Sequence, residues 1–148
     1  DDLTLPVWHD RVAVLAARAL GRFLDAWPGL EPEPQDDARA SYCGKLESAH
    51  GRLDLGGDCL ALARQVRAYT PAPGCWLPCG DDRLRVLAAR AEPAVGDLGP
   101  GQVRRCGQEL LVGCAQGALR LEQVQPAGGR AMAVRDWLNG HGLPARLG

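Results

Sequence analysis

The segment from Arg67 to Trp76 separates two kinds of sequence pattern. Upstream, apolar residues recur at three- and four-residue spacing, which is typical of one helical face; they are Cys59, Leu62, Ala63, Val66 and Tyr69. Downstream, apolar and polar residues alternate as they do in a half-buried strand. Pro71 and Pro73 each lack a backbone N–H and disfavour helical geometry in the preceding residue. A helix over about 57–69 is therefore expected to end near Tyr69.

The residues after this helix allow two interpretations. Gly74 frees the backbone to turn, and Trp76 supplies a large apolar side chain. The simpler interpretation is a helix end followed by a core tryptophan. The other is a rigid joint that fixes a helix carrying Arg64 and Arg67 against a small barrel.

The chain has 148 residues, 46% hydrophobic and 24% charged, as in an ordinary globular protein of one domain with an appendage. No apolar run approaches the roughly 20 residues that cross a bilayer. Residues 1–4, Asp-Asp-Leu-Thr, lack the basic start and apolar core of a signal peptide. A cytoplasmic protein is therefore expected.

The cysteine pattern favours free thiols. A chain that can bury enough core and carries no export signal has little need of disulfides, so the six cysteines are expected to be buried thiols. Cys75 and Cys79 could supply two metal ligands, but the three histidines lie far away in sequence. We therefore expect no metal site.

Residues 1–40 contain a helix and a linker. Apolar residues follow helical spacing from Trp8 to Trp27, and such a stripe needs a partner surface, either in this chain or in another polypeptide. Pro28 and Gly29 end this amphipathic helix, assigned to residues 1–28. Residues 29–40 are acidic and rich in proline, which predicts an extended linker.

Residues 41–148 show the pattern of a small β-rich domain. Short strands separated by glycine and proline turns are typical of a small barrel. Leu84 and Val86 alternate with Arg83 and Arg85, so one face is expected to be core and the other partly cationic. The pattern also predicts the elements that follow: a hairpin through Gly107, a strand over 118–125 and a helix over about 133–138 that ends at Asn139-Gly140.

The sequence offers no pattern for catalysis, which leaves binding. It has no phosphate-binding glycine loop and no nucleophile elbow. Residues 1–40 carry a net charge of −4 and residues 41–148 a net charge of +3. A mildly cationic domain rich in arginine suits contact with phosphate, because the planar guanidinium forms two parallel, charge-assisted bonds.

Two runs of residues resemble the C-terminal domain of the methionyl-tRNA formyltransferase family. The first comprises Pro34-Gln35, Ser41-Tyr42, Lys45-Leu46, Arg52-Leu53-Asp54, Arg67-Ala68-Tyr69, Pro71, Pro73-Gly74 and Trp76. The second comprises Pro100-Gly101, Gly117 to Leu121, Val124-Gln125-Pro126, Gly128, Arg130, Met132 and Leu138-Asn139-Gly140. Together they cover about residues 34–140, while the helix before them resembles the last helix of the family's catalytic domain.

The resemblance implies an α+β, mainly β fold: an OB-like barrel over 41–148 with one inserted helix, preceded by the linker and the amphipathic helix. The family transfers a formyl group from 10-formyltetrahydrofolate to methionyl-initiator tRNA. The residues expected to touch tRNA phosphates are Lys45, Arg67, Arg104, Arg105 and Arg130. The family's catalytic residues have no matching positions here, so this chain alone is expected to be inactive and to bind no cofactor.

Two alternatives remain open at this point. The domain could be a structural module that docks on a separate catalytic partner through the helix over residues 8–27. It could also be the C-terminal part of a sugar-nucleotide formyltransferase, because those enzymes share the Pro-Gly-aromatic pattern.

Overall fold

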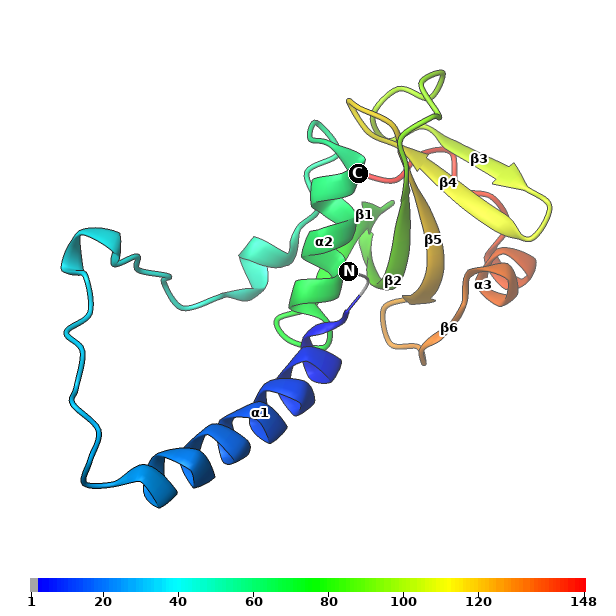
Figure 1. Ribbon diagram of the computed structural model, residues 1–148. Coiled ribbons are helices and arrows are strands. Elements are labelled where there is room, and N and C mark those ends of the chain that lie inside the picture. The colour runs from blue at the N-terminus through cyan, green and yellow to red at the C-terminus, as the bar shows by residue number, and fades with distance from the viewer. Residues whose placement is uncertain (1–2) are drawn as a thin grey trace. The chain divides into compact units, whose positions relative to one another are not determined.

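The computed structural model describes residues 3–148, which fall into two compact units, Leu3–Leu46 and Glu47–Gly148 (Figure 1). We call them the N-terminal unit and the C-terminal unit. Among the described residues, no helix combines the length and the apolar character needed to span a membrane.

The N-terminal unit consists of one long helix and an irregular segment. Helix α1 spans Leu5–Ala26, and Pro6 lies in its first turn, where a missing N–H costs nothing. The helix therefore begins before Trp8, the predicted start, and it ends at Ala26, one residue before the predicted end at Trp27. None of its side chains is buried. Beyond it, the one regular element before residue 47 in the described chain is a short 3₁₀ turn, η1 (Asp37–Arg39).

In the C-terminal unit, a 3₁₀ turn, η2 (Ser48–Gly51), precedes helix α2, which spans Cys59–Tyr69. The Asp58 carboxylate accepts a hydrogen bond from the Ala61 amide at 3.2 Å and so caps the first turn. Thr70 is extended, so the helix ends at Tyr69 as predicted. The predicted apolar face packs on the sheet through Cys59, Leu62, Ala63 and Val66, all of which are buried.

Within the described residues, six strands form one antiparallel sheet in the order β1-β2-β5-β4-β3, with β6 pairing to β5. The strands are β1 (Cys75–Cys79), β2 (Asp82–Glu92), β3 (Val103–Cys106), β4 (Glu109–Gly113), β5 (Ala118–Gln125) and β6 (Met132–Ala133). Gly107 has a positive φ of 63° and forms the predicted turn between β3 and β4. The predicted strand over 118–125 matches β5.

The sheet is open. In residues 3–148, strand β1 pairs only with β2, and β3 pairs only with β4. The mixed α+β class is confirmed, whereas the mainly β character and the OB-like barrel are not. Helix α2 also precedes every strand, so it is not inserted among them.

The last residues of the chain link the two ends of the sheet. The Leu147 amide donates to the Gly101 carbonyl at 3.1 Å, and the Gly148 amide donates to the Pro78 carbonyl on β1 at 3.0 Å. The Leu147 side chain is fully buried in the core. We call residues 146–148 the closing segment, because it connects β1 with the turn that precedes β3.

Helix α3 spans Val134–His141 and adds Trp137 and Leu138 to the core. The predicted end at Asn139-Gly140 is wrong, because the helix continues to His141 and is capped by Gly142, whose φ is 76°. The Trp137 and His141 rings stack at 5.6 Å across this last turn. A glycine with a positive φ is a common helix terminator, and Gly142 rather than Gly140 has that conformation.

Trp76 is not a core residue. Its neighbours Cys75 and Leu77 on β1 are fully buried, and Trp76 is only half-buried, because successive strand residues point to opposite faces. The Trp76 indole N–H donates to the Ser48 carbonyl at 3.2 Å. The core-tryptophan interpretation of this segment is therefore wrong.

The six cysteines are free thiols, and the prediction that they are buried holds in part. Cys59, Cys75 and Cys114 are buried, whereas Cys43 and Cys106 are exposed. Burial raises the pKa of the Cys75 and Cys114 thiols to about 11. These two side chains serve as small apolar core residues.

Candidate nucleic-acid interface

The sheet has a core face and an outer face with different chemistry. Leu84 and Val86 on β2 are buried, whereas Arg83 is exposed and Arg85 is half-buried on the other face. The predicted division into a core face and a partly cationic face is therefore confirmed for this strand. We call the side of the sheet that carries Arg83 and Arg85 the outer face.

Away from β1, the outer-face arginines of β2, β3 and β5 lie beside carboxylates. Arg104 on β3 binds Asp97 at 2.6 Å, and Arg90 on β2 binds Glu122 at 2.6 Å. Arg120 on β5 bonds to both Glu92 and Glu109. The hydrogen bond from Arg104 lowers the pKa of Asp97, so that carboxylate stays charged. These arginines are neutralised by their neighbours.

The end of the sheet near β1 differs, because its arginines surround an aromatic ring. The Arg83 guanidinium carbon lies 4.2 Å from the centre of the Trp76 ring, and that of Arg52 lies 5.9 Å from it. Arg85 donates to the Pro71 carbonyl at 3.2 Å and to Gln125 at 3.5 Å. We call Arg52, Trp76, Arg83 and Arg85 the Trp76 cluster. Within residues 3–148, none of its three arginines forms an ion pair with a carboxylate.

Backbone pairing brings these four residues together. Trp76 lies opposite Arg85 in the β1–β2 ladder, and Arg83 lies two residues along the same strand on the same face. Arg52 arrives from the segment before α2, which runs beside β1, since the Leu53 amide donates to the Trp76 carbonyl at 3.0 Å. The cluster therefore combines side chains from three stretches of the chain.

A hollow of about 390 Å³ opens beside the Trp76 cluster. The residues that line it are Ser48, Pro73, Gly74, Trp76, Arg83, Arg85, Gln125, Pro126, Ala127 and Gly128. Its two charged lining residues are arginines, and the described residues place no carboxylate in this lining. A hollow with this lining suits an anionic group.

The four predicted tRNA contacts in the C-terminal unit do not gather at one place in the structure. Lys45 lies in the N-terminal unit, whereas Arg67 lies half-buried in the last turn of α2. Arg130 is exposed just before β6. In Figure 1, α2 and β3 lie at opposite ends of the sheet, which separates Arg67 from the two arginines of β3.

Those two adjacent arginines point to opposite faces of β3. Arg104 lies opposite Leu111, and Arg105 lies opposite the fully buried Leu110. Arg105 donates to the Gly107 carbonyl at 2.9 Å and to Asn139 of α3 at 3.2 Å. Their adjacency in sequence thus gives two separate positions rather than a pair.

Sequence reasoning did not select Arg52, Trp76 or Arg83 as site residues. The alternation along β2 was a usable signal for Arg83, because it placed that residue on the cationic face. No local pattern places Arg52 next to Trp76, since they meet through a bridge between segments 24 residues apart in sequence, positions 52 and 76.

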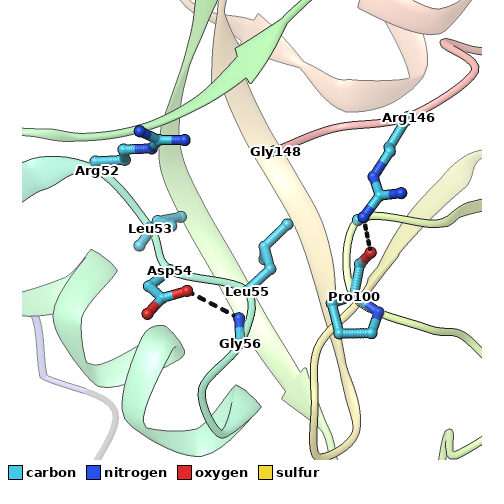
Figure 2. A pocket seen from close by; sticks show the side chains of 9 residues that line it. Arg52, Leu53, Asp54, Leu55, Gly56, Pro100, Arg146 and Gly148 are labelled. Atoms are coloured by element: carbon cyan, nitrogen blue, oxygen red, sulfur yellow. Dashed lines mark hydrogen bonds between the residues drawn. The ribbon is translucent and has the colours of Figure 1, made fainter.

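A second hollow, of about 410 Å³, lies between the segment before α2 and the closing segment (Figure 2). Two of its charged groups are bonded to backbone: Arg146 donates to the Pro100 carbonyl at 2.8 Å, and Asp54 accepts from the Gly56 amide at 3.0 Å. The third is Arg52 of the Trp76 cluster. Its lining thus includes a carboxylate, whereas that of the hollow beside Trp76 includes two arginines and no carboxylate. In the described part of the chain, no cluster of three or more His, Cys, Asp or Glu side chains is arranged to hold a metal ion.

Comparison with known proteins shows what this fold is similar to. The family profile described as "Formyl transferase, C-terminal domain" matches residues 45–142, about two thirds of the chain. The chain belongs to this family. The predicted resemblance to the C-terminal part of methionyl-tRNA formyltransferase is therefore confirmed.

Curated relatives of this formyl transferase C-terminal domain carry one name. Methionyl-tRNA formyltransferase from Methylococcus capsulatus is 38% identical over 154 aligned positions, covering 100% of this chain and 49% of that protein. The protein of the same name from Thermus thermophilus is 43% identical over 128 positions, covering 84% of this chain and 41% of that protein. The chain thus spans about half the length of the curated relatives it matches.

A solved structure shares the fold. The crystal structure of a variant of HypX from Aquifex aeolicus aligns with a TM-score of 0.61 over 87% of this chain and 23% of that chain, at 21% identity. At this identity the likeness concerns the fold alone.

Proposed function

We propose that this chain is the C-terminal, tRNA-binding part of a methionyl-tRNA formyltransferase. The observation that carries the proposal is the match of 84–100% of the chain to proteins of that name, of which it spans about half. The whole enzyme would transfer a formyl group from 10-formyltetrahydrofolate to methionyl-initiator tRNA in the cytoplasm. We assign no catalytic residue and no cofactor to this chain.

Charge and geometry support a role in holding RNA. Arginines extend along the outer face of the sheet, and the Trp76 cluster carries three of them without a carboxylate partner in residues 3–148. The open sheet and its helices form one compact core, as a binding platform requires. The contacts proposed on the family pattern are Lys45, Arg67, Arg104, Arg105 and Arg130. Contacts would be made to the RNA backbone and would depend on the shape of the RNA, because exposed aromatic side chains on which bases could stack are scarce on the C-terminal unit.

The test is filter binding of initiator tRNA to the 148-residue chain across a salt series. The slope of log affinity against log salt is negative, and each phosphate contact should make it steeper by roughly 0.7–0.9. A flat salt response, or no binding at low salt, contradicts the proposal. Arg130→Ala should make the slope less steep by about 0.7–0.9, the value expected for one phosphate contact. Arg18→Ala on α1, outside the proposed surface, should leave the slope unchanged.

One observation favours a second candidate function, a docking module. The described N-terminal unit leaves the apolar side chains of α1 exposed, among them Trp8, Leu20 and Leu24. A stripe of this size normally packs on another surface. The partner proposed is the catalytic part of a formyltransferase. The curated relatives named above make a sugar-nucleotide formyltransferase the weaker alternative.

A further inference from the structure

The strongest feature that the family pattern did not indicate is the hollow beside the Trp76 cluster. Arg83 and Arg52 are both exposed, and both guanidinium groups lie near the Trp76 ring. Elsewhere on the outer face, Arg90, Arg104 and Arg120 are paired with carboxylates. The free positive charge of this face is therefore concentrated around one aromatic side chain.

The arrangement holds the Arg83 guanidinium in place without using its hydrogen-bond donors. A guanidinium over an aromatic face is attracted to the ring, and its N–H groups, which lie in its own plane, stay available. The Trp76 ring is itself fixed, because its indole N–H donates to the Ser48 carbonyl at 3.2 Å. An anion bound here would meet donors that are already oriented, which lowers the entropy lost on binding.

The rest of the hollow also suits a phosphate. Arg85 lines the hollow, is anchored to the Pro71 carbonyl and contributes positive charge. Gln125 and the turn through Gly128 also line it, and the Gln125 amide donates to the Gly129 carbonyl at 2.9 Å. The nearest acid in sequence, Asp82, is not in this lining; it lines a second hollow, which Cys79 and Arg83 also line.

We propose that this hollow binds a phosphodiester group of an RNA strand, with Arg83 as the donor. The inference rests on the proposed function and adds a contact site outside the five residues of the family pattern. Trp76 acts as a positioning residue, because its ring holds the Arg83 guanidinium, and Arg85 adds positive charge to the lining. A planar, bidentate donor is needed, so arginine should not be replaceable by lysine at position 83.

The first test compares single variants of the 148-residue chain in filter binding of initiator tRNA. Arg83→Ala should weaken binding roughly tenfold and lower the salt slope by about 0.7–0.9, because one charge-assisted phosphate contact is lost. Arg83→Lys should keep most of the salt slope but bind less tightly than the wild type. The matched control is Arg90→Ala, which removes one exposed positive charge from the same strand, where Glu122 neutralises it. It should stay within about twofold of the wild type.

The outcomes separate this inference from the proposed function. If the wild-type chain does not bind tRNA at low salt, the proposed function fails and the inference with it. If the wild type binds but Arg83→Ala and Arg90→Ala lose affinity equally, only net charge matters and the hollow is not a site.

The second test uses inorganic phosphate and the indole N–H resonance of Trp76, assigned by its loss in Trp76→Phe. Phosphate should shift this resonance in the wild type and in Arg90→Ala but not in Arg83→Ala. A shift that survives in Arg83→Ala contradicts the assigned donor. A phosphate-dependent shift in the wild type combined with unchanged tRNA binding by Arg83→Ala would show that the hollow takes small anions rather than RNA.

Discussion

Gly74 lies in the turn between α2 and β1, and its conformation supports the Trp76 cluster. Its φ is +85°, a value that other residues adopt at a cost, and a side chain here would collide with the Arg85 guanidinium. Glycine therefore permits both the turn and the close passage of Arg85 toward the Pro71 carbonyl.

Gly74→Ala should destabilise the chain by about 2 kcal/mol, because the Arg85 guanidinium must move and give up its hydrogen bond to Pro71 in addition to the backbone strain. Gly80→Ala is the matched control: Gly80 also has a positive φ, +61°, but the space around it is open. It should cost about 1 kcal/mol. Urea unfolding of both variants measures the difference, and equal losses would show that contact with Arg85 is unimportant.

The buried thiols make stability depend on pH in the alkaline range. Burial raises the pKa of Cys75 from 9.0 to about 11. Between these values the unfolded chain loses the proton while the folded chain keeps it, so the free energy of unfolding falls as pH rises from about 9 to about 11. Each such thiol contributes roughly 1.4 kcal/mol per pKa unit.

Unfolding in urea at pH 8 and pH 10.5 measures this loss. Cys75→Ala should lose less stability between the two pH values than the wild type, although it starts from a lower value because a buried sulfur is removed. Cys106→Ala, at an exposed position, should show the wild-type dependence. A Cys75→Ala profile parallel to that of the wild type would contradict the assignment.

For single residues, the sequence predicted which face of the sheet a side chain occupies better than it predicted which side chains lie in contact. The alternation of Arg83 and Arg85 with Leu84 and Val86 correctly indicated their two faces. It could not place Trp76 under Arg83, because that contact depends on the register of β1 against β2. Register is a property of two strands and is not encoded in either one alone.

Among the elements, the closing segment is expected to contribute more to the stability of the fold than its length suggests. Leu147 is fully buried, and its amide bonds to Gly101. Leu147→Ala should cost about 2–4 kcal/mol, since it removes a buried side chain and leaves a cavity. Leu143→Ala is the control, because Leu143 is 50% exposed, and it should cost less than about 1 kcal/mol. Thermal or urea unfolding of both variants measures the two losses. Similar losses would mean that the closing segment is dispensable for stability.

Helix α1 offers the test of the docking function. Leu20→Glu together with Phe23→Glu should abolish co-purification with a catalytic formyltransferase polypeptide, because both side chains are exposed on the apolar stripe. Circular dichroism should show the C-terminal unit still folded. Arg18→Glu, on the polar side of the same helix, should keep the association. Normal association of the double variant would rule out α1 as the docking element.

Elements with strong local signals were predicted well. The proline pair placed the end of α2 correctly, and Gly107 placed the β3–β4 turn. Helix α3 was predicted too short, because glycine inside a helix looks like a terminator in sequence, while the actual cap, Gly142, is distinguished by its φ. Closure into a barrel was not predictable from local patterns, since it depends on whether distant strand edges meet.

For the whole molecule, the class and the cationic character followed from the sequence, but the location of free charge did not. The net charge of +3 over 41–148 says nothing about pairing. Only the fold shows that carboxylates neutralise Arg90, Arg104 and Arg120 and leave the Trp76 cluster unpaired within residues 3–148. The distribution of ion pairs, rather than the number of arginines, therefore makes Arg83 the candidate contact.

The burial of Leu147 also has a consequence for synthesis of the chain. The ribosome makes the sheet, α2 and α3 before it makes residue 147, yet the core of the C-terminal unit includes that residue. A nascent chain that stops short of it has strands ready to pair and a gap in the apolar interior. The Trp76 cluster lies on β1, whose Pro78 carbonyl accepts the Gly148 amide. The backbone that carries the surface proposed to meet RNA therefore has its full set of hydrogen bonds only after residue 148 has left the ribosome.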